Sequence, residues 1–288
     1  MSHDRIGYRN LETAPAPGWR SVSAICRWNL QMVIRQKMFW FLVSLGLLSF
    51  LYHYAIIYIK AQITVESPQF AQFLDRFMVT GDGRGYREFL AMQARAVVLI
   101  MAYAGAVLVA NDFRAGGIAF YLSRPINKYH YVFGKAFSLW MIIGLLTLAP
   151  GLFLFAAYGF LSNSMQYFWD NPRIAMGIAA YSLIIMTVPS LLVLAVGAVC
   201  RGAAPLLMVW CGIFLLLPAF SELLKLVFDS NDWLFMNLWR NMHVLGRYFF
   251  GAKENAHDIL WSTIIIGWVC VGSIAVLRWR LRAVEVVE

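Results

Sequence analysis

Apolar residues gather in six long runs that are separated by polar or basic segments. The runs are Met38–Ile59, Phe89–Ala110, Ala136–Phe160, Ile174–Val199, Ala203–Phe220 and Ile259–Leu277. A helix needs about 20 apolar residues to cross the hydrocarbon core of a bilayer. Arg95 interrupts the second run, Pro189 interrupts the fourth, and the fifth is short. The pattern still predicts an all-α integral membrane protein whose six transmembrane helices occupy residues 38–277.

The composition supports this fold class. Of the 288 residues, 61% are hydrophobic and 14% are charged, whereas a soluble domain carries about 45–50% apolar and about 25% charged residues. A water-soluble globule and a disordered chain are therefore excluded. The four cysteines form no CxxC pair, so the sequence predicts neither a disulfide framework nor a metal site.

The positions of Lys and Arg predict the orientation of the spans. The two terminal segments, the loop between the second and third spans and the turn between the fourth and fifth hold 14 of the 24 Lys and Arg residues. The same segments carry the whole net charge of +9. Because basic loops stay on the cytoplasmic side, we expect both termini to be cytoplasmic. These charges flank membrane spans and face an anionic leaflet, so we expect no binding to nucleic acid.

The segments outside the spans have helical patterns of their own. Residues 1–18 form a polar tail, and residues 278–288 form a short cytoplasmic tail. Within residues 19–37, polar and apolar side chains divide between opposite helical faces, which predicts an amphipathic helix at the cytoplasmic interface. A solvated basic leader is the alternative. On the outer side, the spacing of apolar residues from Phe70 to Met78 predicts a second amphipathic helix.

The outer segment between the last two spans is unusually apolar. Residues 221–258 are rich in Leu, Phe and Trp, but Asp229, Asn231 and Asp232 interrupt them. Re-entrant half-helices that dip into the outer leaflet would explain this pattern if protein buries their broken backbone. The alternative is a peripheral aromatic anchor.

Motifs for catalysis or metal binding are missing from the sequence. It contains no HExxH, no GxSxG with partner residues and no phosphate-binding loop. The central parts of the spans also lack the ionisable groups of an ion-driven transporter. Arg95, in the outer third of the second span, either snorkels to the interface or lines an outward cavity. We therefore expect no enzyme activity, no bound metal or cofactor, and an energy source on another subunit.

The loop between the second and third spans carries the most specific pattern. It reads Asn-Asp-Phe-Arg-Ala-Gly-Gly-Ile-Ala-Phe-Tyr-Leu-Ser-Arg-Pro-Ile over residues 111–126, and Gly134-Lys135 follows. Gly116 and Gly117 let the chain turn, Ile118–Leu122 can form a short apolar helix, and Pro125 ends it. Such a helix on a basic face suits docking into a partner's groove. An interfacial linker helix is the alternative.

This segment resembles the loop of the type-two ATP-binding-cassette (ABC) exporter permeases. The matching residues are Asp112, Gly117, Tyr121–Ile126, Lys128 and Gly134-Lys135, whereas Asp replaces the commoner Glu and Ile118 replaces Thr. The layout of amphipathic leader, six spans and interrupted segment before the last span is also similar to that family.

The resemblance implies a dimeric permease, formed with a second copy or a related permease, in a bacterial-type inner membrane. A separate ATPase chain would bind ATP-Mg and dock on the loop. The residues expected in the docking loop are Asp112, Phe113, Arg114, Gly116, Gly117, Ile118, Phe120, Leu122, Ser123, Arg124 and Pro125. Within this loop, Asp112 and Arg114 would supply polar contacts and Ile118–Leu122 an apolar ridge.

Two other classes of function remain open. A structural or assembly subunit of a larger membrane complex would need the spans but no ATPase. A membrane enzyme that acts on lipid would need a polar catalytic cluster near one interface, and the sequence shows none. The transported substrate is not encoded in any pattern that we recognise.

Overall fold

The computed structural model describes residues 18–66, 82–110, 128–162, 165–200 and 202–285. Every regular element in these ranges is helical. Six helical stretches are long and apolar enough to cross a membrane, which confirms the predicted fold class. They are Lys37–Ile59, Gly83–Leu108, Tyr129–Leu161, Pro172–Val199, Ala203–Phe228 and Ala256–Arg280.

The first half of the chain forms α1 (Gly18–Ile34), α2 (Lys37–Glu66), α4 (Gly83–Gly105) and the π-helix η1 (Ala106–Ala110). The third span consists of α7 (Lys128–Leu146) and α8 (Leu148–Leu161). It breaks at Thr147 because Pro150 has no amide hydrogen and its ring crowds the carbonyl of the residue four positions earlier. The hydroxyl of Thr147 donates to Ile143 O at 2.9 Å, beside the bond from its own backbone amide.

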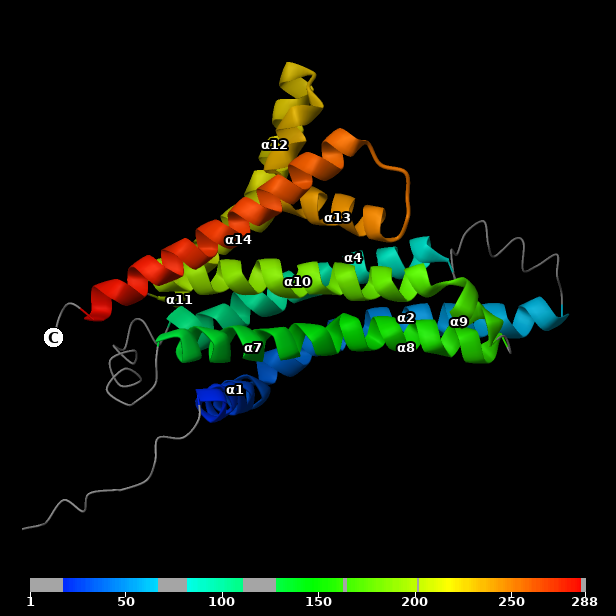
Figure 1. Ribbon diagram of the computed structural model, residues 1–288, viewed down its shortest axis with the longest axis horizontal. Coiled ribbons are helices and arrows are strands. Elements are labelled where there is room, and N and C mark those ends of the chain that lie inside the picture. The colour runs from blue at the N-terminus through cyan, green and yellow to red at the C-terminus, as the bar shows by residue number, and fades with distance from the viewer. Residues whose placement is uncertain (1–17, 67–81, 111–127, 163–164, 201, 286–288) are drawn as a thin grey trace, which may run out of the picture.

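The second half begins with the short α9 (Gln166–Asp170) and the long α10 (Pro172–Val199). α10 continues through Pro189 and packs against α4, α7, α8, α13 and α14. It is the most buried span, with 61% of its apolar window inside the protein, and it forms the centre of the bundle (Figure 1).

The fifth span is a broken helix made of α11 (Ala203–Cys211), the π-helix η2 (Gly212–Leu216) and α12 (Leu217–Phe228). Pro218 leaves the carbonyl of Phe214 without its helical amide partner. Trp239 supplies a replacement, because its indole nitrogen donates to Phe214 O at 3.3 Å. The helix starts at the predicted Ala203 but ends at Phe228 rather than Phe220, and Ser221 is accommodated by donating to Pro218 O at 2.7 Å.

The interrupted outer segment folds into the 3₁₀ helix η3 (Asn231–Met236) and α13 (Leu238–Phe249), followed by α14 (Ala256–Glu285). α12 ends at Phe228, and the next residue, Asp229, adopts a left-handed conformation with φ 46°. In Figure 1, α12 leans away from the bundle, whereas α13 turns back toward α10. The segment is therefore helix, break and helix, and the insertion of these helices into the outer leaflet stays a prediction.

α1 and the C-terminal turns of α14 lie at the same end of the bundle (Figure 1). At this end Arg280 of α14 donates to Ala198 O near the end of α10 at 3.0 Å. The opposite end holds the first turn of α4, α9 and the end of α13. The cytoplasmic location of the termini stays a prediction.

Candidate functional site

The predicted docking loop, from Asp112 to Pro125, lies outside the described residues. The same holds for the predicted outer helix at residues 70–78. The structure does describe the two helix ends that flank the docking loop, namely the end of η1 and the start of α7. We therefore build the site from these ends.

Lys135 connects the two flanking helices to α1. It lies on the second turn of α7 and is only 1% exposed. Its ammonium donates to the carbonyl of Leu108 in η1 at 2.6 Å and to Asn29 Oδ1 of α1 at 3.0 Å. Asn29 in turn donates to Ser138 Oγ at 3.4 Å. One buried cation therefore joins the three elements that surround the start and end of the loop.

The position of Lys135 has a simple electrostatic reason. Leu108 is among the last residues of the α4–η1 helix, where carbonyl groups lack an intrahelical amide partner. These carbonyls carry the partial negative charge of the helix dipole, so a cation near them is stabilising. Lys135 thus caps the end of the second span at the point where the loop leaves it.

The neighbouring Gly134 lets α1 approach α7 closely. A β-carbon at this position would lie 2.8 Å from Ile25 Cγ2 of α1, which is closer than real side chains approach. Ile25, Cys26, Asn29 and Val33 form the buried stripe of α1. The amphipathic face predicted for this helix is present, and α7 covers much of its apolar side.

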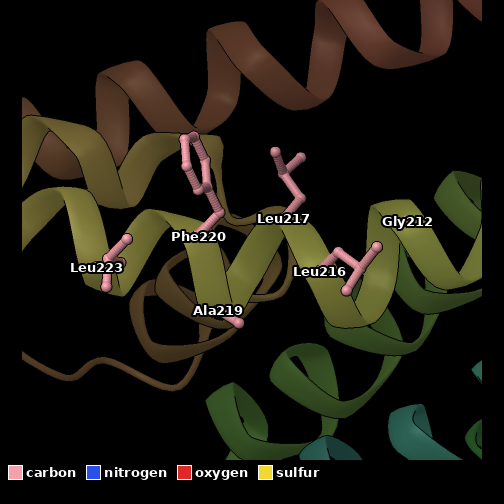
Figure 2. Close-up of a pocket in the computed structure, with 6 residues that line it drawn as sticks. All are labelled: Gly212, Leu216, Leu217, Ala219, Phe220 and Leu223. Carbon is pink, nitrogen blue, oxygen red and sulfur yellow. The ribbon is translucent and has the colours of Figure 1, made fainter.

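A second feature is the apolar hollow along the broken fifth span. Figure 2 shows Gly212, Leu216, Leu217, Ala219, Phe220 and Leu223 around it. Its volume is about 530 Å³, and none of its lining side chains is polar. The hollow can make apolar contacts with a group of matching shape, but its lining has no side chain that could take part in catalysis or polar binding.

A comparison with protein families identifies what these features belong to. The family model described as ABC-2 family transporter protein matches residues 23–244. The matched range includes most of α1, the flanking helix ends, Lys135 and the loop between them. This chain belongs to the ABC-2 transporter family. A search of curated proteins finds no match.

ABC-2 membrane subunits are permeases without an ATPase domain of their own, and they normally pair with an ATP-binding subunit. Within the described part of this ABC-2 chain, no group of three His, Cys, Asp or Glu side chains could hold a metal ion. Apolar spans and hydrogen-bonded helix ends are its main features.

Arg95, the other residue singled out in the sequence, lies on α4 and is exposed. It is close enough to His243 of α13 for its charge to act on that imidazole. Its role as the lining of an outward cavity stays a prediction. It lies near the middle of the Gly83–Leu108 span, whereas Lys135 contacts the end of that span at Leu108.

Sequence reasoning missed two buried polar residues, one in this site and one elsewhere in the bundle. Lys135 was part of the recognised motif but was not assigned to the site, although a Lys at the start of an apolar run was a usable signal. Gln93 lies in the second span, is 1% exposed, and donates to Gly46 O at 2.9 Å. It lines a cavity of about 400 Å³ between α2, α4 and the third span. A single Gln in an apolar run gave no pattern to detect.

Proposed function

We propose that this chain is the membrane-spanning permease subunit of an ATP-driven ABC-type exporter. A separate ATPase chain binds ATP-Mg and docks on the loop between the second and third spans. Closure of the ATPases rocks the spans and moves substrate outward across a bacterial-type inner membrane. The family match over residues 23–244 is the observation that carries this proposal.

The arrangement around Lys135 supports the coupling role of the loop. A push on the loop reaches η1 and α7 together, because Lys135 bonds to Leu108 O from within α7. The contact with Asn29 extends the connection to α1. In this mechanism a force on Asp112–Pro125 moves the second and third spans as one unit.

Pairing of two permeases completes the proposed pathway. The fifth and sixth spans each have only 17% of their apolar window buried within one chain. The uncovered side chains of these two spans must contact either lipid or another protein chain. The apolar hollow of Figure 2 is a candidate pairing surface, because apolar side chains of a second permease can fill it.

The test is purification of the tagged chain from its native host in mild detergent, followed by an ATPase assay. We expect a stoichiometric ATPase chain in the eluate, and we expect Ile118→Asp or Asp112→Asn to remove it. Ile6→Asp and Asp4→Asn make matched changes in the polar tail and should leave the ATPase bound. A folded sample that never carries an ATPase chain would support an assembly subunit instead.

A further inference from the structure

The cavity between the first, second and third spans is apolar except for one buried amide. Its volume is about 400 Å³, and small-molecule sites commonly measure about 300–1,000 Å³. Among the described residues that line it, Gln93 alone has a polar side chain. The lining residues that matter for binding come from α2, α4 and the bent third span, and they are Gly46, Phe50, Gln93, Leu146, Pro150 and Phe153.

The amide of Gln93 has one atom without a partner. Its Nε2 donates to Gly46 O at 2.9 Å, and a carbonyl can only accept, so the amide must turn its nitrogen toward Gly46. Its Oε1 is buried and has no hydrogen-bond partner in the described part of the chain. A buried acceptor without a donor has lost the hydrogen bonds that water would give it. A bound molecule that carries a donor would restore one of them.

The bend of the third span adds a second acceptor beside the cavity. Pro150 has no amide hydrogen, so the carbonyl of Leu146, four positions earlier, lacks its helical partner. Both residues line the cavity. Neither this carbonyl nor the Gln93 oxygen is charged, and both accept hydrogen bonds. Together they favour a neutral molecule that carries a hydrogen-bond donor.

Gly46 keeps space open beside the Gln93 oxygen. A β-carbon on Gly46 would lie 3.1 Å from Gln93 Oε1 and 3.2 Å from Leu146 Cδ2. A larger residue at this position would therefore cover the oxygen. The methyl group of Leu146 is the end of a flexible side chain, which can move aside for the hydroxyl of a ligand.

The depth of the cavity limits the charge of its ligand. Gln93 is about 15 Å along the second span from its start at Gly83, at about 1.5 Å per helical residue. The hydrocarbon core of a bilayer is about 30 Å thick, so this residue lies near its middle. A charged group is costly at that depth unless a partner compensates it, and no lining side chain is charged. A lipid headgroup is therefore a poor occupant.

The apolar wall favours an aromatic body. The rings of Phe50 and Phe153 meet edge to face with centroids 5.7 Å apart, and aromatic rings pack favourably against a further ring in such arrangements. Leu47, Leu145 and Phe153 line the cavity and are more than half exposed, so it opens to the outer surface of the bundle. A molecule dissolved in the membrane can enter from that side.

We propose that this cavity binds a small, neutral aromatic molecule with a hydroxyl donor, namely a phenol. The hydroxyl lies beside Gly46 and donates to Gln93 Oε1, and the ring packs against Phe50 and Phe153. This binding needs neither transport nor an ATPase partner, so it stands or falls separately from the proposed function.

The experiment is fluorine NMR of the purified full chain in mild detergent with two probes. Para-(trifluoromethyl)phenol carries the ring and the donor, whereas para-(trifluoromethyl)anisole carries the same ring with its hydroxyl methylated. The fluorine line width of each probe is followed as protein is added, with empty micelles of the same detergent as the reference. We expect saturable broadening of the phenol and about fivefold to tenfold weaker binding of the anisole, which cannot donate to Gln93.

Variants locate the binding. Gln93→Met keeps the length of the side chain but removes the acceptor, so the phenol should bind only as weakly as the anisole. Gln166→Met, on an exposed residue of α9, should change neither affinity. Ala149→Phe fills the cavity and should abolish binding of both probes. Ala275→Phe adds the same ring at an exposed position of α14 and should leave binding intact.

Three results would overturn the proposal. The first is a phenol signal that protein broadens no more than empty micelles do, and the second is equally tight binding of the two probes. The third is phenol binding that survives Ala149→Phe. Ala149 is exposed, so this variant keeps the test valid if Gln93→Met does not fold.

Discussion

At the scale of residues, Lys135 shows how a charge is accommodated inside an apolar bundle. Its ammonium is surrounded by the Leu108 carbonyl and the Asn29 amide oxygen, which replace the hydrogen bonds of water. The apolar stem of the side chain packs in the core while the charge meets the end of a helix. The residue is therefore both a helix cap and a link between three elements.

Replacing Lys135 with Met should lower the free energy of unfolding. The substitution keeps the length of the side chain but leaves Leu108 O and Asn29 Oδ1 without this donor, and each unsatisfied buried acceptor costs about 1–3 kcal/mol. We expect a clear decrease in the midpoint of thermal unfolding in detergent. Lys37→Met changes an exposed lysine at the same end of the bundle and should have a small effect. Equal stability of the two variants would contradict the role given to Lys135.

His243 gives a prediction for pH dependence. Burial lowers the pKa of its imidazole, the charges of Arg87, Arg247 and Arg95 lower it further, and Glu88 opposes them. In the unfolded chain the pKa of a His side chain is about 6.5. As the pH falls through that value, the unfolded state takes up a proton that the folded state resists, so stability should fall with falling pH.

The measurement is the unfolding midpoint between about pH 7.5 and pH 5 for the protein and for His243→Gln. The unfolding midpoint of the variant should fall less at acidic pH than that of the unsubstituted protein. The reason is that the variant lacks the imidazole that binds an extra proton on unfolding. His257→Gln, an exposed histidine on α14, is the matched control. If the two variants follow the same pH profile, the assignment to His243 fails.

At the scale of elements, the pairing of α1 with α7 depends on a small residue. The sequence predicted a polar and an apolar face for residues 19–37, and the buried stripe of α1 follows that division. The sequence pattern could not reveal that another helix covers the apolar side, because period alone does not distinguish lipid from protein. Gly134 and Ile25 meet across 109 positions of sequence, so only the fold brings them together.

Gly134→Ala should push α1 away from α7. The new β-carbon would lie 2.8 Å from Ile25 Cγ2, and such overpacking costs about 1–3 kcal/mol. Combining it with Ile25→Ala should recover part of the loss, because the obstructing methyl group is removed. Gly272→Ala on α14 has no neighbouring atom within 4 Å and should be neutral or stabilise by up to about 1 kcal/mol. A destabilised Gly272→Ala with an unaffected Gly134→Ala would contradict the packing.

The fifth span shows where element boundaries escape a sequence reading. The short apolar run ended at Phe220, before the polar Ser221 and Glu222. In the structure the helix continues to Phe228. The polar Ser221 is compatible with the helix because its hydroxyl donates a hydrogen bond to the carbonyl of Pro218 on the preceding turn. The π-helix before Pro218 and the indole of Trp239 that completes it were equally out of reach, since they join segments that are distant in sequence.

At the scale of the whole molecule, one chain leaves the first, fifth and sixth spans largely uncovered, with 22%, 17% and 17% of their apolar windows buried. α10 is enclosed by its neighbours, but the fifth and sixth spans are mostly unburied. If two permeases pair as proposed, these faces are where we expect the second chain.

Ala219→Trp tests the proposed pairing. The indole would fill the hollow that Figure 2 shows on α12 and prevent a second chain from entering it. We expect a shift from dimer to monomer by light scattering in mild detergent. Met176→Trp places the same ring on an exposed position of α10 and should leave the dimer intact. A dimer that tolerates Ala219→Trp would place the pairing surface elsewhere.

The sequence by itself determined the membrane class, the six spans and the family of the loop. Each of these depends on local information, because an apolar run of sufficient length must be helical in lipid and a motif is read along the chain. Only the tertiary structure decided which polar groups meet. Lys135 with Leu108 and Asn29, and Trp239 with Phe214, are brought together by packing. Their energies depend on burial and on partners far away in sequence, which no period or motif records.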